Sequence, residues 1–300
     1  MKRSSVPVAA TGLGGLVGSR VRAGTAGEVD WLPLQVDIRE PDATLTRVAA
    51  TPADVVVNFA AFTDVSAAYA QRGREDGPCF RTNVLGARHL ARACARAGKH
   101  LVHISTDYVF AGDRAGVYTE DEPGDATEDW YGFTKRLAED EIRARCDGAA
   151  IVRIAAPFSA LPGVKEEVVG AVLRQLGERT LPPMFVDRVF TPTCIEDLAA
   201  LLVAVIRGRV AGTFHAVTTQ PLSPYDFAVL IADAYGRDAG RVRRGELADY
   251  LSRGGRPYPR RLALANAATG DRLGVSLRDV PTCLAAMRAT AMTGTAACRG

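Results

Sequence analysis

The sequence predicts an α/β protein with a doubly wound parallel sheet and a smaller C-terminal portion. Three observations carry this prediction. Short apolar segments rich in β-branched residues alternate with Ala- and Arg-rich segments over the first half of the chain. A glycine-rich loop follows the first apolar segment. Beyond about residue 157 the alternation gives way to proline-rich turns, such as the one at residues 180–187.

Bulk composition excludes several classes of protein. A chain of 300 residues that is 47% hydrophobic and 24% charged can bury one large core or two unequal ones. The 37 basic and 34 acidic residues give a net charge of +3, which is too close to neutral for a nucleic-acid partner. The longest apolar runs, such as residues 198–206, are too short to span a membrane.

Six cysteines are scattered along the chain without the close pairs of a disulfide framework or a zinc site. Free thiols are typical of a reducing compartment. Proline, threonine and glycines interrupt residues 1–19, which therefore lack the apolar run of a secretory signal. We expect a cytoplasmic protein without bound metal, and a homodimer is one assembly open to it.

Four segments in the first half are expected to be buried strands: residues 6–10, 54–60, 100–106 and 149–156. Their apolar character is continuous rather than alternating, which is typical of parallel strands that are covered on both faces. Residues 83–98 predict an amphipathic helix between the second and third of these strands.

Gly12, Gly15 and Gly18 follow the first expected strand in the segment TGLGGLVGS. Glycines at this spacing allow a sharp turn, a close approach of backbone N–H groups to a pyrophosphate, and tight packing of the helix that begins near Leu16. Parallel sheets also bind ligands at the carboxyl ends of their strands. The loop therefore predicts a Rossmann-like dinucleotide site.

The cofactor is expected to be NADPH or NADH, with NADPH slightly favoured. An acidic residue about 20 positions beyond the glycine loop can bind the adenosine ribose, and Asp30 and Asp37 both qualify. Arg20 and Arg22 could instead meet a 2′-phosphate. The sequence leaves this choice open.

The loop and the strands assign residues 1–156 to a dinucleotide-binding domain, and residues 157–300 form a substrate-side portion. Residues 192–208 predict a strongly amphipathic helix. We therefore expect about 186–215 to pack back on the first domain. A further helix is predicted at 223–236, where Ser223 precedes an acidic residue by three positions in the manner of a capping box.

Thr106 ends the third expected strand in HISTDYVF, and Tyr131 and Lys135 follow in WYGFTKRLAED. Tyr131 and Lys135 are four residues apart and share one face of a helix. Only four of the 37 basic residues are lysines, so this spacing is distinctive. The ammonium is expected to lower the pKa of the phenol, which is ordinarily ~10. Tyr131 would then protonate the oxygen of a ketone as hydride reaches its carbon, while Thr106 holds that oxygen.

These segments resemble the extended short-chain dehydrogenase/reductases. Within that superfamily the chain is similar to the dTDP-4-dehydrorhamnose reductase family of sugar-nucleotide 4-ketoreductases. The matching segments extend over most of the chain, and the most specific is STDYVFAG followed by YGFTK. Others lie at residues 11–18, 54–65, 82–91 and 191–199.

The resemblance implies NAD(P)H-dependent reduction of a keto group on a nucleoside diphosphate sugar. The implied catalytic residues are Thr106, Tyr131 and Lys135, and Lys135 would also bond to the nicotinamide ribose. The implied cofactor-binding residues are Gly12, Gly15, Leu16, Gly18, Asp37, Ile38, Ala60, Ala61, Phe62, Tyr131 and Lys135. The implied substrate-binding residues are Thr106, Asp107, Ala156 and Arg188. Asn83 either supports the site or is the N-cap of its helix.

Two departures from the family pattern fall on the substrate side. The family tends to have a tryptophan after the strand at 149–156, where this chain has Ala156. The family also tends to have an Asp-Gln pair and a small residue before Thr191, where this chain has Asp187, Arg188, Val189 and Phe190. An arginine suits a phosphate or a carboxylate. The identity of the sugar is therefore left open.

Other interpretations stay open. A non-catalytic nucleotide-binding regulatory subunit could share this fold. A nucleotide-sugar epimerase or dehydratase is a further alternative, although dehydratases commonly carry a carboxylate pair after the catalytic hydroxyl and Asp107 is followed by Tyr108. The arginine-rich segment 240–261 is either a solvated surface or a contact for a nucleotide diphosphate.

Overall fold

The structure is a computed structural model that describes residues 4–125, 127–161 and 163–297. Its centre is a six-stranded sheet with the strand order β2-β1-β3-β4-β5-β8, in which every neighbouring pair is parallel. The strands are β1 (Val6–Thr11), β2 (Val29–Pro33), β3 (Val55–Asn58), β4 (His100–Thr106), β5 (Ala150–Ile154) and β8 (Gly212–His215). The predicted α/β class and doubly wound parallel sheet are confirmed.

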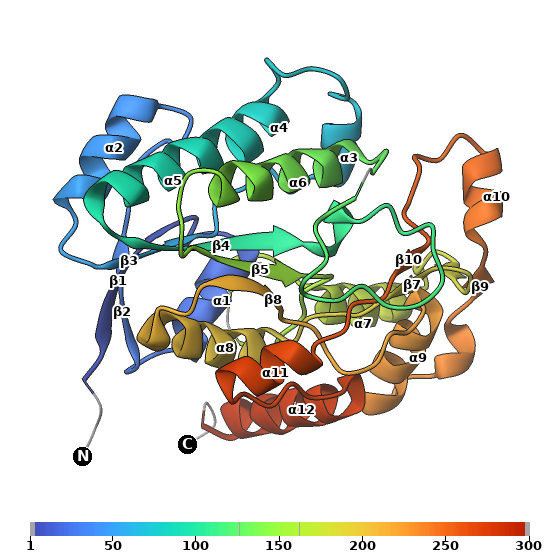
Figure 1. The fold of residues 1–300 in the computed structure, drawn as a ribbon. Helices are drawn as coiled ribbons and strands as arrows, with labels where there is room; N and C mark the ends of the chain where they lie inside the picture. Colours follow the sequence, from blue (N-terminus) through green and yellow to red (C-terminus); the bar gives the residue numbers. More distant parts are fainter. Residues whose placement is uncertain (1–3, 126, 162, 298–300) are drawn as a thin grey trace.

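Helices cover both faces of this sheet (Figure 1). One face packs against α2 (Pro41–Ala50), α5 (Gly86–Ala97) and α6 (Trp130–Arg143), whose apolar side chains form one core with the sheet. The other face packs against α1 (Leu16–Gly24) and α8 (Ile195–Gly208), which form a second core. Burial on both sides explains why the central strands are continuously apolar.

The C-terminal portion has a core of its own, built on α7 (Val168–Glu178), α9 (Pro224–Ala234) and α12 (Val280–Ala297). Two small parallel sheets join its loops, one from β6 (Met184–Phe185) and β9 (Arg244–Gly245), the other from β7 (Val189–Phe190) and β10 (Arg261–Leu262). The shorter helices are α3 (Val65–Tyr69), α4 (Pro78–Phe80), α10 (Leu247–Ser252) and α11 (Ala267–Leu273).

The four predicted strands and the helices at 192–208 and 223–236 are all present. Ser223 and Asp226 form the expected capping box of α9. The helix predicted at 83–98 is confirmed only from Gly86, because Arg81–Leu85 form a π-helical turn before it. Within 186–215, α8 packs on the main sheet and β8 extends it. The domain division at residue 156 stays a prediction.

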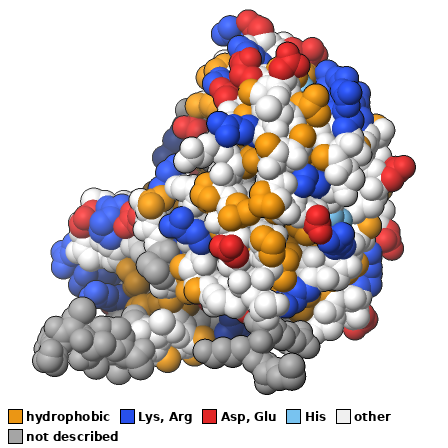
Figure 2. Space-filling model, turned by 90° about the vertical axis from the view of Figure 1, so that its left-hand side faces the viewer, with side chains coloured by type: hydrophobic (Ala, Val, Ile, Leu, Met, Phe, Trp, Pro, Cys, Tyr) orange, Lys and Arg blue, Asp and Glu red, His pale blue; other side chains and the backbone are white. Residues whose placement is uncertain are grey.

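The surface and the thiols fit the expectations from composition. Five cysteines are free and buried: Cys79, Cys94, Cys146, Cys194 and Cys283. Figure 2 shows basic and acidic side chains interspersed over one face of the molecule. Within the described ranges, the helices are each too short or too polar to cross a membrane.

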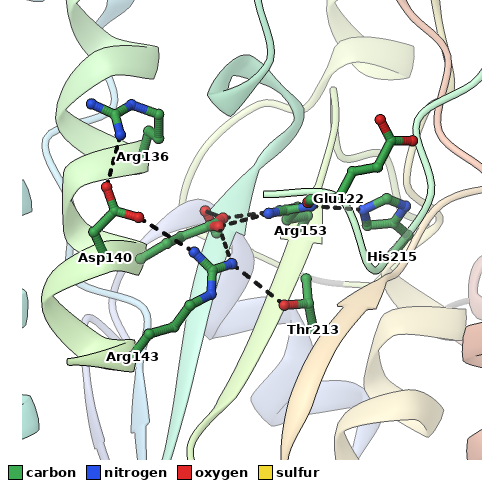
Figure 3. A network of polar contacts seen from close by, with 9 residues as sticks. Glu122, Arg136, Asp140, Arg143, Arg153, Thr213 and His215 are labelled. Carbon is green, nitrogen blue, oxygen red and sulfur yellow. Dashed lines mark hydrogen bonds and ion pairs between the residues drawn. The ribbon is translucent and has the colours of Figure 1, made fainter. Parts of the chain in front are cut away.

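A buried ion pair joins α6 to the sheet (Figure 3). Glu139 on α6 accepts hydrogen bonds from Arg153 on β5 at 2.8 and 3.0 Å, and both side chains are fully buried. Ser105 on β4 donates to the same carboxylate at 2.6 Å, and Arg143 adds a bond at 2.7 Å. Burial raises the pKa of Glu139, but these partners outweigh burial and hold it below its ordinary value of 4.5.

We expect Glu139→Gln to lower the free energy of unfolding by about 3–5 kcal/mol at pH 7, because it leaves the Arg153 guanidinium buried without a counter-charge. Chemical denaturation measures this loss. The loss should shrink below pH 4.5, since a carboxylate with a depressed pKa stabilises the fold above its unfolded value and stops doing so as the pH falls through its folded value.

Asp140→Asn is the matched control, because Asp140 is the next residue of α6 and pairs with Arg136 and Arg143 in an exposed position. Its effect should stay within about 1 kcal/mol. Equal losses of unfolding free energy in the two variants would show that the buried ion pair contributes no more to stability than the exposed one.

Candidate active site

The glycine loop lies at the carboxyl end of β1 and leads into α1. Gly12 has a φ of +70°, and a Cβ there would come within 2.5 Å of the Ala60 nitrogen. A Cβ on Gly18 would come within 2.6 Å of the Gly12 oxygen. Both positions therefore require glycine, one for the turn and one for the packing of the helix against the turn.

The outer side of the loop is open. A Cβ on Gly14 would meet no atom within 4 Å. Gly15 is the N-cap of α1, and no side chain caps this helix end. Backbone N–H groups at such a helix start are suited to an anion. The loop thus has the shape and the donors that a dinucleotide pyrophosphate needs.

Asn83 holds the neighbouring loop that contains Ala60, Ala61 and Phe62. Its side chain accepts from the Phe62 N–H at 2.8 Å and donates to the Phe62 carbonyl at 3.2 Å. It also donates to Thr134 of α6 at 3.0 Å. Asn83 is inside the π-helical turn, so the alternative that it is an N-cap is wrong. It ties the loop to the helix that carries Tyr131.

Asp37 and Arg39 follow β2 at the same edge of the sheet. Their side chains form a bidentate ion pair with contacts of 2.6 to 3.0 Å, and hydrogen bonding from Arg39 lowers the pKa of Asp37 to about 2. The Ile38 side chain is buried against Gly86 of α5. Sequence reasoning missed Arg39.

The other ribose candidates lie elsewhere. Asp30 stands near the amino end of β2, away from the glycine loop. The Arg20 side chain is buried and donates to the carbonyls of Leu16 and Lys165, so it holds a loop instead of facing the ribose edge. Arg22 is exposed on the last turns of α1. Of the two acidic candidates, the structure favours Asp37.

Thr106 and Asp107 lie buried at the carboxyl end of β4. The Thr106 hydroxyl donates to the Asp107 carboxylate at 3.0 Å. Burial raises the pKa of Asp107 to about 6, although the nearby Arg188 charge and the Thr106 hydroxyl pull it down. A carboxylate that is costly to keep charged often marks a functional site.

Tyr131 stands in the first turn of α6, which Asp129 caps by accepting from the Gly132 N–H at 3.0 Å. Its ring packs edge-on against Tyr108, with centroids 5.8 Å apart. Burial raises the pKa of Tyr131, and its hydrogen bond with Thr106 offsets part of that rise. The expected lowering of this pKa by Lys135 is therefore wrong in this structure.

Lys135 is one turn further along α6 and only 1% exposed. Its Nζ donates to the Ile104 carbonyl at 2.7 Å and lies 2.9 Å from His103 Nε2. Burial lowers the pKa of Lys135 from 10.5 to about 8. Sequence reasoning missed His103, although it stands in the quoted segment HISTDYVF.

Arginines and tyrosines gather beside Tyr131. Arg188 donates to the Tyr108 hydroxyl at 3.1 Å, and its guanidinium carbon lies 5.0 Å from the centre of the Tyr258 ring. Arg256 lies 3.7 Å from the centre of the same ring and donates to Asp129 at 3.1 Å. The arginine-rich segment 240–261 thus contributes the guanidinium of Arg256 near the candidate catalytic tyrosine. The sequence alone had not indicated Arg256.

Ala156 follows β5 and is exposed. Its φ of +36° lies in the left-handed region, which costs a residue with a Cβ about 1–2 kcal/mol. No side chain longer than a methyl group projects from this position.

Comparison with known proteins gives the family. The family described as RmlD substrate binding domain matches residues 7–290. The chain belongs to this family. The resemblance predicted from the sequence segments is thereby confirmed.

Individual relatives and a solved structure are similar to this chain over most of its length. The dTDP-4-dehydrorhamnose reductase of Mycobacterium tuberculosis is 35% identical, over 83% of this chain and 81% of that protein. The probable low-salt glycan biosynthesis reductase Agl14 of Haloferax volcanii is 31% identical, over 85% of this chain and 83% of that protein. A crystal structure of dTDP-4-dehydrorhamnose reductase from Bacillus anthracis, in complex with NADP, has a TM-score of 0.85 at 23% identity and covers 95% of this chain and 99% of that chain.

We expect Asp107→Asn to stabilise this RmlD substrate binding domain family member by about 1–3 kcal/mol at pH 8. The folded pKa of Asp107, about 6, exceeds its ordinary value of 3.8, so folding binds a proton between these values and the charge destabilises the fold above pH 6. The gain should fade as the pH falls from 6 to 4. Urea denaturation of both proteins at pH 4 and pH 8 tests this, and a variant less stable at pH 8 would contradict it.

Proposed function

We propose that this chain catalyses NAD(P)H-dependent reduction of a keto group on a nucleotide-linked deoxy sugar, as a 4-ketoreductase of the dTDP-4-dehydrorhamnose reductase type. The observation that carries this proposal is the convergence of Tyr131 and Thr106 at the carboxyl end of β4. The glycine loop lies at the same edge of the sheet, and Arg188 lies close enough to act on the pKa of Asp107. Relatives named as reductases cover most of the chain.

NADPH or NADH supplies hydride when it is bound. Gly12, Gly15, Leu16 and Gly18 would hold the pyrophosphate at the start of α1, and residues 60–62 would line the path to the ribose. Asn83 supports this loop with two hydrogen bonds. Lys135 retains an N–H that can donate to a ribose hydroxyl, since its other contacts are with Ile104 and His103.

Tyr131 is the proton donor. Burial raises the pKa of its phenol, so the proton stays on Oη at neutral pH and is available when negative charge develops on a substrate oxygen. Thr106 lies beside the phenol and can hold the same oxygen through its hydroxyl. In the structure the Thr106 hydroxyl donates its single proton to Asp107, so this proton must turn from Asp107 to the substrate oxygen when the substrate binds.

The nucleotide part of the substrate would occupy a cavity of about 590 Å³. Arg188 and Tyr258 line this cavity and also belong to the cluster of arginines and tyrosines beside Tyr131. Phe185, Tyr250 and Tyr258 meet there edge to face, with ring centroids 5.6 to 6.0 Å apart. Aromatic rings suit a base, and guanidinium groups suit a diphosphate. Arg244 and Arg253 also line the cavity, so it combines both kinds of contact.

A cytoplasmic location is part of this proposal, and it rests on the five buried free thiols. A homodimer stays a prediction from the sequence. The regulatory-subunit and epimerase or dehydratase alternatives are outcomes of the following test.

Tyr131→Phe should lower kcat by about 10²–10⁴-fold and leave the Kd for NADPH within about twofold, because it removes a transferred proton and little binding surface. Nicotinamide absorbance is followed while wild type and variant meet a panel of nucleoside diphosphate 4-keto sugars. NADPH binding without oxidation of NADPH by any sugar would favour the regulatory subunit. Nucleoside diphosphate hexoses without a keto group are offered as well, and their conversion to a 4-keto or an epimerised sugar without net NADPH use would favour the dehydratase or epimerase.

Arg39→Ala should weaken NADPH binding about tenfold and change NADH binding less than about twofold. Arg39 neutralises Asp37 and can bond to a 2′-phosphate, so its loss leaves a bare carboxylate facing that phosphate. Paired dissociation constants for the two cofactors measure this. Arg22→Ala is the control and should change neither constant; equal weakening of both cofactors by Arg39→Ala would contradict the assignment.

A further inference from the structure

A chain of buried polar side chains crosses the sheet between the glycine loop and Lys135. It consists of Thr11 on β1, Asn58 on β3, His103 on β4 and Lys135 on α6, each at most 2% exposed. Such side chains are costly to bury unless their hydrogen bonds are made. The direction of each bond can be traced along the chain.

The direction is fixed at Asn58. The Ala60 backbone N–H can only donate, and it donates to Asn58 Oδ1 at 3.1 Å. The Thr11 hydroxyl donates to the same oxygen at 2.6 Å. The oxygen of the Asn58 amide is thereby identified, and the amide NH₂ must point the other way, toward His103.

The orientation of the Asn58 amide determines which nitrogen of His103 carries the proton. Asn58 Nδ2 lies 3.0 Å from His103 Nδ1, so Nδ1 must be the acceptor. Burial is the main cause that lowers the pKa of His103 well below its usual range, so the ring is neutral. A neutral imidazole with an acceptor at Nδ1 carries its proton on Nε2. That Nε2–H points at Lys135 Nζ, 2.9 Å away.

An ammonium has no lone pair and cannot accept a hydrogen bond. A neutral amine can accept from His103, donate to the Ile104 carbonyl, and keep one N–H free. We propose that His103 is a positioning residue that presents its Nε2–H to Lys135 and thereby favours the uncharged amine of Lys135 over the ammonium before the cofactor binds. This inference rests on the proposed role of Lys135 in ketoreduction.

Apart from His103, the ionisable groups that face Lys135 are Glu139 and Cys79, and neither is a free anion in contact with the ammonium. Glu139, one turn on along α6, favours the ammonium, but its carboxylate is bonded to Arg153, Arg143 and Ser105. Cys79 on α4 is a thiol whose pKa is raised by burial, so it is uncharged at neutral pH. The pKa of Lys135 is lowered to about 8, which is the direction that this geometry favours, and the neutral amine becomes the major form above pH 8.

The consequence for the reaction is a lysine that can exchange a proton near neutral pH, which a lysine at its ordinary value of 10.5 rarely does. Lys135 stands one turn from Tyr131 on the same face of α6. After Tyr131 has given up its proton, such a lysine is suited to reload the phenol. His103 would act on this step only through Lys135.

Nuclear magnetic resonance on the full chain without cofactor or substrate tests the proposal directly. The sequence has four lysines and four histidines, so selective labelling of these types gives simple spectra. Imidazole ¹⁵N shifts report which ring nitrogen carries the proton, and lysine ¹³Cε shifts report the charge on Nζ. Lys135→Arg and His103→Gln assign the two signals.

We expect His103 to carry its proton on Nε2 from pH 6 to 9, and Lys135 to lose its charge at least one pH unit below the usual lysine value. Asn58→Asp replaces the donor by an acceptor of the same shape. It should move the His103 proton to Nδ1 and raise the titration midpoint of Lys135 by at least one unit, a tenfold change. Asn58→Leu removes the donor without adding charge and should shift both signals in the same direction.

His100, at the other end of β4, is the internal control, and its tautomer should not change in either variant. The proposal would be overturned if His103 carries its proton on Nδ1 in the wild type. It would also be overturned if the Asn58 variants change the tautomer of His103 but leave the titration midpoint of Lys135 unchanged. If Asn58→Asp does not fold, Asn58→Leu decides. Because no turnover is measured, a failed ketoreductase assay would leave this result standing, and the reverse also holds.

Discussion

The buried ion pair between Glu139 and Arg153 fixes the helix on which the candidate active site depends. Tyr131, Lys135 and Glu139 follow one another at intervals of four residues and so share the face of α6 that meets the sheet. With Glu139 bonded to β5 and β4 by three hydrogen bonds, α6 can neither rotate nor slide without leaving a charge buried alone. The phenol and the amine thereby gain fixed positions beside β4.

Charge is distributed unevenly about this helix. The Arg39–Asp37 pair follows β2 beyond the edge of the sheet, whereas Arg188 and Arg256 stand among tyrosines. Asp107 lies buried between the Thr106 hydroxyl and the Arg188 charge. Guanidinium groups that can bind an anion thus lie near a buried carboxyl group whose charge is costly, and near a lysine whose own pKa is lowered.

The parts of the molecule that follow from local rules were predictable from sequence. Continuous apolar runs gave the central strands, and the glycine spacing and the Tyr131–Lys135 interval located the site. The strand β2 was not anticipated, since Val29–Pro33 contains an aspartate, a tryptophan and a proline in place of a β-branched run. The pKa of Tyr131, the tautomer of His103 and the position of Arg256 depend on side chains that meet only after folding, so no sequence pattern indicates them.

Strand β8 has a consequence for how the protein can be divided. It comes from residues 212–215, yet it pairs with β5 and completes the edge of the main sheet, while α8 covers one face of that sheet. A fragment cut after residue 156 would leave β5 as a bare, apolar edge open to intermolecular strand pairing. The N-terminal half is therefore not a module that can be transferred by itself. A chimera that exchanges the C-terminal half must still supply a strand that pairs with β5 in the place of β8.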